Sequence, residues 1–186
     1  HRRSSAASDV YKRQVEYDGR HYVGWQRQDN GPSIQAAVEE AILNFCGEQV
    51  EVIAAGRTDS GVHALGMTTH FALLNNNHDP ATVRKAINFH LGSQPIKIIE
   101  TEIVPDSFHA RFSAIERRYL YRILNRQSPP TLDCGRVWHV PRKLDIAGMQ
   151  EAAEILIGEH DFSSFRAKDC QAASPIKTVS YTHLTL

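Results

Sequence analysis

The 186-residue sequence predicts an α+β fold, in which antiparallel sheets carry helices on one face. Two kinds of segment predict it: short β-branched runs, and longer stretches whose apolar residues recur every three or four positions. Their order along the first half of the chain is strand, helix, strand, strand, helix, strand. That order is the ferredoxin-like pattern, which RNA-recognition modules also use.

The first unit, residues 15–104, is divided by signals at the ends of its helices. Ser33 and Asp79 are typical N-cap residues. Pro80 suits the first position of a helix, and Gly47 suits the end of one. In chain order, the expected elements are a strand ending at Tyr17, a helix from Ser33 to Gly47, strands at Glu51–Ala55 and Met67–Leu74, a helix beginning at Asp79, and a strand at Ile96–Val104.

A second unit, residues 105–179, is expected to be the first part of another ferredoxin-like unit that lacks its closing half. Its expected elements are a strand at Ile115–Leu124, a strand at Arg136–Val140, and a helix that Asp145 caps and Gly158 ends. In the first of these strands Tyr119 and Tyr121 would face the same side.

The two ends of the chain differ from the rest. Residues 1–14 are rich in Ser, Ala and Arg and have no apolar period, and residues 180–186 do not continue the preceding pattern. We interpret residues 1–14 as a non-native leader and residues 180–186 as a non-native tail, and we exclude both from the predicted fold.

Composition excludes several classes of protein. Lys plus Arg and Asp plus Glu number 21 each, so bulk charge does not favour a nucleic-acid partner. No apolar run is long enough for a membrane helix, so we expect a cytoplasmic protein without a membrane partner. The cysteines form no Cys-x-x-Cys pair, which argues against a disulfide framework or a zinc site. RNA binding would need a local basic surface, for which the candidates are Arg57, Arg111, Arg117, Arg118, Arg166 and Lys168.

One carboxylate, Asp59, lies between Gly56 and Gly61 in the stretch that joins the second and third strands. Catalytic residues often lie on loops that a rigid scaffold positions. Asp and Gly are also favoured in turns for backbone reasons alone, so spacing by itself leaves both interpretations open. His63, His70 and His109 lack metal-ligand spacing and are expected to be hydrogen-bonded structural residues.

The segment from Gly56 to Ala64, GRTDSGVHA, resembles the active-site motif of the tRNA pseudouridine synthase A family. Further blocks in the same order extend the resemblance over about residues 15–179: Glu16–Gly19, Gly24–Gln28, Ser33–Gln35, Phe108–Ser113, Arg117–Tyr121 and Asp161–Phe165.

This resemblance implies the pseudouridine synthase fold and the isomerisation of uridine in the anticodon stem-loop of tRNA. It implies that Asp59 is catalytic, that Arg57 assists nucleotide flipping, and that Tyr119 lies against the target uracil. Arg111 and Arg118 are further expected substrate-binding residues. No cofactor or metal is implied, and the full-length parent is expected to be a homodimer. The chain is expected to be a fragment, because the C-terminal motif that completes the family's site is missing from it.

The chemistry suits a carboxylate, because an aspartate can attack either the base or the sugar and form a covalent intermediate. Two other classes compete with this interpretation. Asp59-Ser60-Gly61 matches the triplet of aspartic proteases, although those proteins are almost all β and the residues before the triplet here are not apolar. A non-catalytic RNA-binding module would explain the aromatic and basic residues without a role for Asp59.

Overall fold

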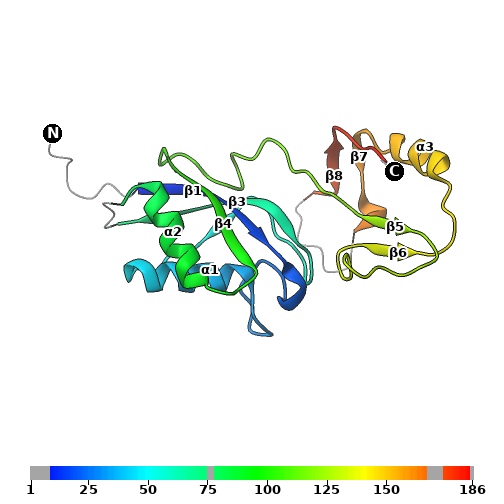
Figure 1. Cartoon of the computed structure of the whole chain (residues 1–186). Coiled ribbons are helices and arrows are strands. Elements are labelled where there is room, and N and C mark those ends of the chain that lie inside the picture. Colours follow the sequence, from blue (N-terminus) through cyan, green and yellow to red (C-terminus); the bar gives the residue numbers. More distant parts are fainter. Residues whose placement is uncertain (1–8, 75–77, 167–173, 185–186) are drawn as a thin grey trace. The chain divides into compact units, whose positions relative to one another are not determined.

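The computed structural model describes residues 9–74, 78–166 and 174–184, and the chain divides into two compact units. The first unit ends at Tyr119 and the second begins at Leu120. Figure 1 shows the order of their elements. The boundary therefore lies later than the expected one after Val104, because the segment 105–119 makes its contacts within the first unit.

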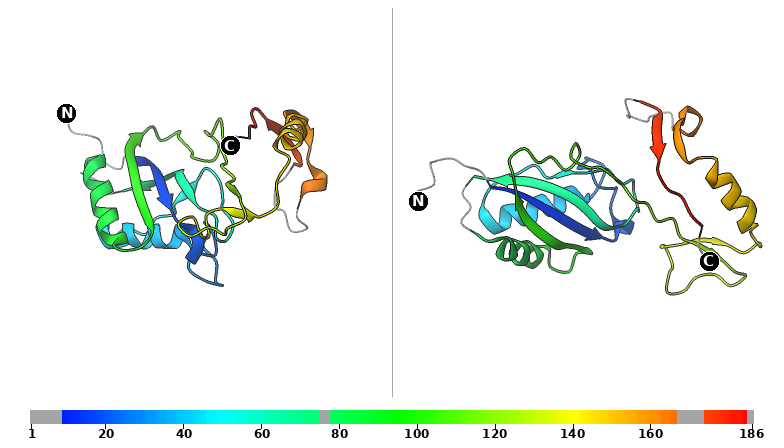
Figure 2. Two further views of the ribbon diagram at one scale, coloured as in Figure 1. Left: turned by 45° about the vertical axis from the view of Figure 1, so that its right-hand side comes forward. Right: turned by 90° about the horizontal axis from the view of Figure 1, so that it is seen from above.

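The first unit is built on a 4-stranded antiparallel sheet in the order β2-β3-β1-β4. Figure 2 shows its two helices on the same face of that sheet. The elements are β1 (Asp9–Tyr17), the short 3-10 helix η1 (Gly19–His21), α1 (Ile34–Cys46), β2 (Ile53–Ala54), β3 (Ala64–Leu73), α2 (Pro80–Leu91) and β4 (Ile96–Val104). Both the predicted order of elements and the antiparallel pairing are confirmed in this unit.

The predicted helix caps are confirmed. Ser33 Oγ accepts a hydrogen bond from the Ala36 amide at 3.2 Å and begins α1, and Gly47 ends it with a left-handed φ of 75°. Asp79 Oδ1 accepts the Ala81 amide at 2.9 Å at the start of α2. These caps satisfy amides or carbonyls that the first and last helical turns leave unpaired.

The apolar core lies between the sheet and the two helices. In α1 every fourth residue from Ile34 to Ile42 is buried, which brings one face of the helix against the sheet. Phe71 from β3 and Ile87 from α2 are among the other fully buried members. This packing supports the edge of the sheet from which the loop after β2 leaves.

Strand β1 includes residues that were excluded from the predicted fold. Asp9 to Gln14 pair with β3 on one side, Val10 to Gln14 also pair with β4 on the other, and Tyr11 is completely buried. The exclusion was wrong for these residues, because central pairing on both sides outweighs a polar composition. The residues before Asp9 lie outside the described part of the chain, and the non-native origin of residues 1–14 stays a prediction.

Arg13 shows what this placement costs. Its side chain is 1% exposed, and its guanidinium carbon lies 3.7 Å from the ring centroid of Phe71. None of its three side-chain nitrogens has a hydrogen-bond partner among the described residues. Burial lowers the pKa of Arg13 well below its usual value. Because a guanidinium keeps its proton in proteins, we expect this burial to reduce stability rather than to change the charge.

The described part of the second unit contains small sheets and one α-helix. Its elements are β5 (Ile123–Asn125), β6 (Trp138–Val140), α3 (Ile146–Glu154), β7 (Gly158–Asp161), the 3-10 helix η2 (Ser163–Phe165) and β8 (Ile176–Val179). β7 pairs with β8 antiparallel, as expected, but β5 pairs with β6 in parallel, so the expectation of antiparallel sheets is wrong for that pair. Asp145 caps α3 as predicted, by accepting the Gly148 amide at 3.1 Å, but no residue of the helix is buried.

The predicted strand at Ile115–Leu124 is largely wrong. Only its last residues enter β5, and Tyr119 and Tyr121 lie in irregular chain before it. The alternation of side chains was a real pattern, but a strand forms only where another strand accepts its hydrogen bonds, and the described residues offer none to this segment. The strand predicted at Arg136–Val140 is likewise shortened to Trp138–Val140.

No helix in the described ranges combines the length and the apolar character that a membrane crossing requires.

Candidate active site

Asp59 lies on the loop that joins β2 to β3, as predicted. The residue is exposed, and its carboxylate makes no hydrogen bond or ion pair with any described residue. Its backbone is fixed, because the Asp59 carbonyl accepts the Val62 amide at 3.2 Å. A carboxylate presented in this way is open to a ligand and is held at its main chain.

A second loop, residues 18–25, holds the Asp59 loop from the side. The Trp25 amide donates to the Thr58 carbonyl at 3.0 Å. The Tyr17 hydroxyl lies 2.8 Å from the Thr58 hydroxyl, within hydrogen-bond distance. Both Tyr17 and Trp25 are buried, so the residue directly before Asp59 is bound to the core of the unit.

The two glycines of this second loop allow the close approach. A Cβ at Gly19 would lie 2.0 Å from the Val62 carbonyl oxygen, and one at Gly24 would lie 2.6 Å from that of Thr58. Gly24 also has a φ of +120°, which side chains rarely adopt. Sequence reasoning placed both glycines in family motifs but did not predict that they contact the Asp59 loop. Nothing in the spacing alone indicates a contact between segments so far apart in the chain.

The far side of the Asp59 loop is fixed by polar contacts. The Ser60 hydroxyl donates to the Tyr22 carbonyl at 3.2 Å. His63 Nδ1 accepts the Gly19 amide at 3.2 Å and lies 3.1 Å from Asp18 Oδ1. The loop is therefore anchored on both sides of Asp59.

The segment after β4 docks on β3 through two histidines. The Ala110 amide donates to His70 Nδ1 at 3.1 Å, and the His70 and His109 rings lie 4.8 Å apart. Burial, and then the neighbouring His109, lower the pKa of His70. His63, His70 and His109 each accept a hydrogen bond from a backbone amide, as expected.

The other predicted site residues are exposed, and most of them lie outside the Asp59 loop. Arg57 lies on the same loop. Arg118 pairs with Glu116 at 3.0 Å, and this hydrogen bond raises the pKa of Arg118. The Tyr119 side chain is 86% exposed. No contact joins Arg111, Arg118 or Tyr119 to Asp59 among the described residues. The structure therefore shows an anchored loop, and the expected substrate-binding side chains outside it do not contact Asp59.

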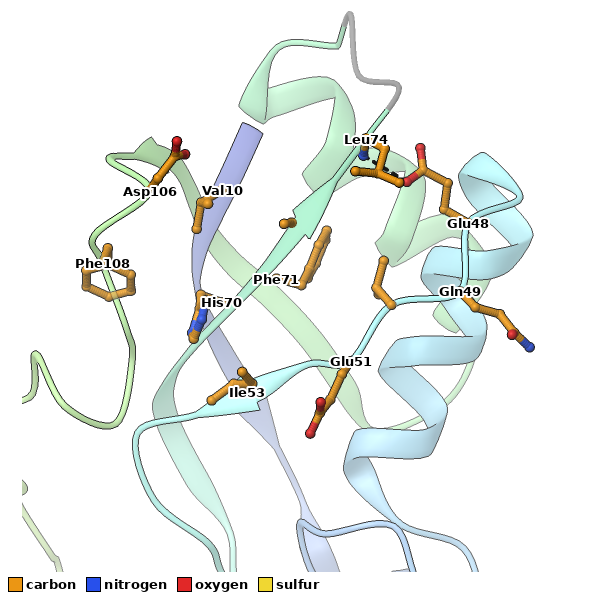
Figure 3. A pocket seen from close by; sticks show the side chains of 12 residues that line it. Val10, Glu48, Gln49, Glu51, Ile53, His70, Phe71, Leu74, Asp106 and Phe108 are labelled. Carbon is orange, nitrogen blue, oxygen red and sulfur yellow. Dashed lines mark hydrogen bonds between the residues drawn. The ribbon is translucent and has the colours of Figure 1, made fainter. Parts of the chain in front are cut away.

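A hollow of about 370 Å³ lies elsewhere on the first unit, beside β2 and the C-terminal end of β3. Figure 3 shows Glu48, Glu51 and Asp106 around it with apolar side chains such as Phe71 and Phe108. None of the predicted site residues lines it. Among the described residues, no three His, Cys, Asp or Glu side chains gather as metal ligands would.

Comparison with known proteins agrees with the motifs. A family model described as tRNA pseudouridine synthase matches residues 14–113 and 152–186. The tRNA pseudouridine synthase A of Rhodospirillum rubrum is 58% identical over 175 residues, which is 94% of this chain and 63% of that protein. That of Rhodospirillum centenum is 56% identical over 170 residues, 91% of this chain and 69% of that protein. That of Caulobacter vibrioides is 52% identical over 169 residues. The chain thus spans about two thirds of the length of these relatives.

Proposed function

The chain belongs to the tRNA pseudouridine synthase family, and we propose that the protein isomerises uridine to pseudouridine in the anticodon stem-loop of tRNA, with Asp59 as its nucleophile. The observation that carries this proposal is the loop itself. Its main chain is anchored before and after Asp59, while the carboxylate is exposed and has no partner among the described residues. A nucleophile needs both a fixed position and access to its substrate.

The reaction breaks the glycosidic bond, rotates the uracil and rejoins it to the sugar through carbon. Asp59 can hold one of the two pieces as a covalent intermediate, either by attack on the base or by attack on the anomeric carbon. The reaction is an isomerisation, so its product contains the same atoms as its substrate. No redox equivalent and no nucleotide is consumed.

The target nucleotide must leave the stacked RNA before a carboxylate can reach it. Tyr119 has a free, exposed ring for the flipped uracil, and stacking on an aromatic residue contributes about 1–3 kcal/mol per base. Arg57, on the same loop as Asp59, assists the flipping. Arg111 and Arg118 are exposed and would contact phosphates of the RNA.

The finer organisation of the protein is part of the same proposal. The residues that follow Tyr119 contribute to a second ferredoxin-like unit, and the relatives, which are longer than this chain, would contain the residues that complete it. The full-length protein acts in the cytoplasm, where tRNA is used, as a homodimer.

The direct test is to incubate an unmodified tRNA transcript with the protein, in a form extended to the length of its relatives, and to map pseudouridine in the product. Pseudouridine in the anticodon stem-loop is the expected result. Binding of tRNA without any pseudouridine would favour the RNA-binding module instead, and cleavage of a peptide would favour the protease.

A further inference from the structure

Arg117 joins two backbone segments beside the Asp59 loop. Its Nε and Nη2 donate to the Ala55 carbonyl at 3.0 and 2.7 Å, and Nη2 also donates to the Arg111 carbonyl at 3.2 Å. Neither acceptor is a charged group. The side chain is exposed, so burial does not force it into this position; the hydrogen bonds hold it there.

Ala55 is the point at which the Asp59 loop leaves the sheet. Its amide donates to the Thr68 carbonyl of β3 at 2.8 Å, while its carbonyl is the acceptor for Arg117. The next residue is Gly56, where a Cβ would lie 3.8 Å from Arg117 Nε. The guanidinium therefore lies directly over the first peptide of the loop.

We propose that Arg117 is a positioning residue for Asp59: it fixes the direction in which the chain leaves β2 and so sets where the carboxylate meets its substrate. This proposal rests on the proposed function. The contacts of Thr58 and Ser60 hold the middle of the loop, and Arg117 holds its beginning. The simpler alternative is that Arg117 is one more basic contact to RNA phosphate.

The geometry favours positioning over phosphate binding. A forked guanidinium meets phosphate best with two parallel donors, and in Arg117 Nε and Nη2 already share the Ala55 carbonyl. A lysine would keep the positive charge but would present a single ammonium in place of the planar fork. Arg117→Lys thus separates the two roles.

Hydrogen exchange tests the positioning in the chain alone, without RNA. We expect Arg117→Met to accelerate exchange of the Trp25, Gly61 and Val62 amides, which bond to or from the loop, by about tenfold. The matched control is Arg84→Met. Arg84 on α2 also donates to a backbone carbonyl, that of Ile99, but on the opposite edge strand of the sheet. The Arg84→Met variant should leave the exchange rates of the three loop amides unchanged.

The amides that join β1 to β4 serve as an internal reference for intact folding. If they stay protected and the loop amides exchange no faster in Arg117→Met than in the original chain, Arg117 does not position the loop and the proposal is overturned.

Turnover separates positioning from charge. In the extended protein, we expect Arg117→Met and Arg117→Lys both to lower kcat about tenfold, with KM for tRNA changed less than about twofold. Full rescue by lysine, or a rise in KM with a smaller salt dependence, would assign Arg117 to phosphate binding and overturn the proposal. If the original protein forms no pseudouridine, the proposed function fails, while the exchange experiment still decides whether Arg117 holds the loop.

Discussion

Asp59 and Arg13 are opposite cases of a charged side chain without a partner. Asp59 is exposed, so water solvates its carboxylate and the missing partner costs little. Arg13 is buried between the sheet and the helices, where its guanidinium lies against the Phe71 ring. None of the residues that the structure describes accepts a hydrogen bond from it. The first arrangement suits a reactive group, and the second reduces the stability of the unit.

Replacing Asp59 with Asn should abolish pseudouridine formation and leave tRNA binding intact, because the amide keeps the size of the side chain and loses its nucleophilicity. The rate of the extended protein should fall at least about a hundredfold. Single-turnover assays on a tRNA transcript measure this. Asp106→Asn, which removes an exposed carboxylate outside the loop, is the control. A variant with more than about a hundredth of the original rate would require a different nucleophile.

Replacing Arg13 with Met should stabilise the first unit by about 1–3 kcal/mol, because the unpaired buried charge is removed and an apolar chain still packs on Phe71. Urea denaturation followed by circular dichroism measures the difference. Lys12→Met on the same strand is the matched control, since the Lys12 ammonium is partly exposed, where it pairs with Glu102 at 2.7 Å and lies 5.8 Å from the ring centroid of Phe108. Equal or lower stability in the Arg13 variant would mean that its contact with the ring outweighs the cost of burial.

Sequence patterns predicted the residues that act locally. Ser33 and Asp79 cap the starts of helices and Gly47 ends one, each through contacts with neighbouring residues, and all three were identified correctly. Asp59 was correctly placed on the loop between strands. The contact of Gly24 with Thr58 and the place of Arg13 inside the sheet depend on partners far along the chain, and no local pattern indicates them.

Between elements, Gly24 combines a close backbone approach with a positive φ. Gly24→Ala should destabilise the unit by more than about 2 kcal/mol and reduce turnover, since both its φ of +120° and the nearby Thr58 carbonyl oppose a Cβ. Gly47→Ala is the control, because Gly47 has a positive φ but no atom within 4 Å of the added Cβ. It should cost only about 1 kcal/mol and keep activity. Thermal denaturation compares them, and equal losses would show that the steric contact is unimportant.

The docking of Ala110 on His70 should weaken in acid. Burial lowers the pKa of His70 from its ordinary 6.5, so the unfolded chain takes up the proton first as the pH falls. The stabilisation is complete above pH 6.5 and is lost progressively below it, because a protonated Nδ1 can no longer accept the Ala110 amide. His109 faces the same ring and would add repulsion once charged.

His70→Gln tests this dependence, since its amide oxygen can accept the same hydrogen bond but does not titrate. Urea denaturation at pH 7.5 and at pH 5.5 should show a smaller loss of stability in the variant than in the original chain. An identical loss in both would mean that another group is responsible.

Over the whole molecule, the two units differ in how much core they have. All the buried residues in the described part of the chain lie between Val10 and Ala110, within the first unit. The second unit exposes large apolar side chains, among them Tyr121, Leu132 and Ile155. Local patterns predicted the helix α3 but could not indicate whether a core forms beneath it, because burial depends on which other elements are present.

Limited proteolysis should therefore cleave the second unit first. Trypsin should cut early at Arg122 and Arg126, which are exposed beside the short strand β5, because a unit with few buried contacts opens readily. Arg84 and Lys85 on the packed helix α2 are internal controls and should remain uncut while the first unit stays folded.

A stable fragment that ends near Arg118, identified by mass spectrometry, would place the boundary after the docked segment instead of after Val104. Equal resistance of both units would contradict the prediction and would mean that the second unit closes a core of its own in solution.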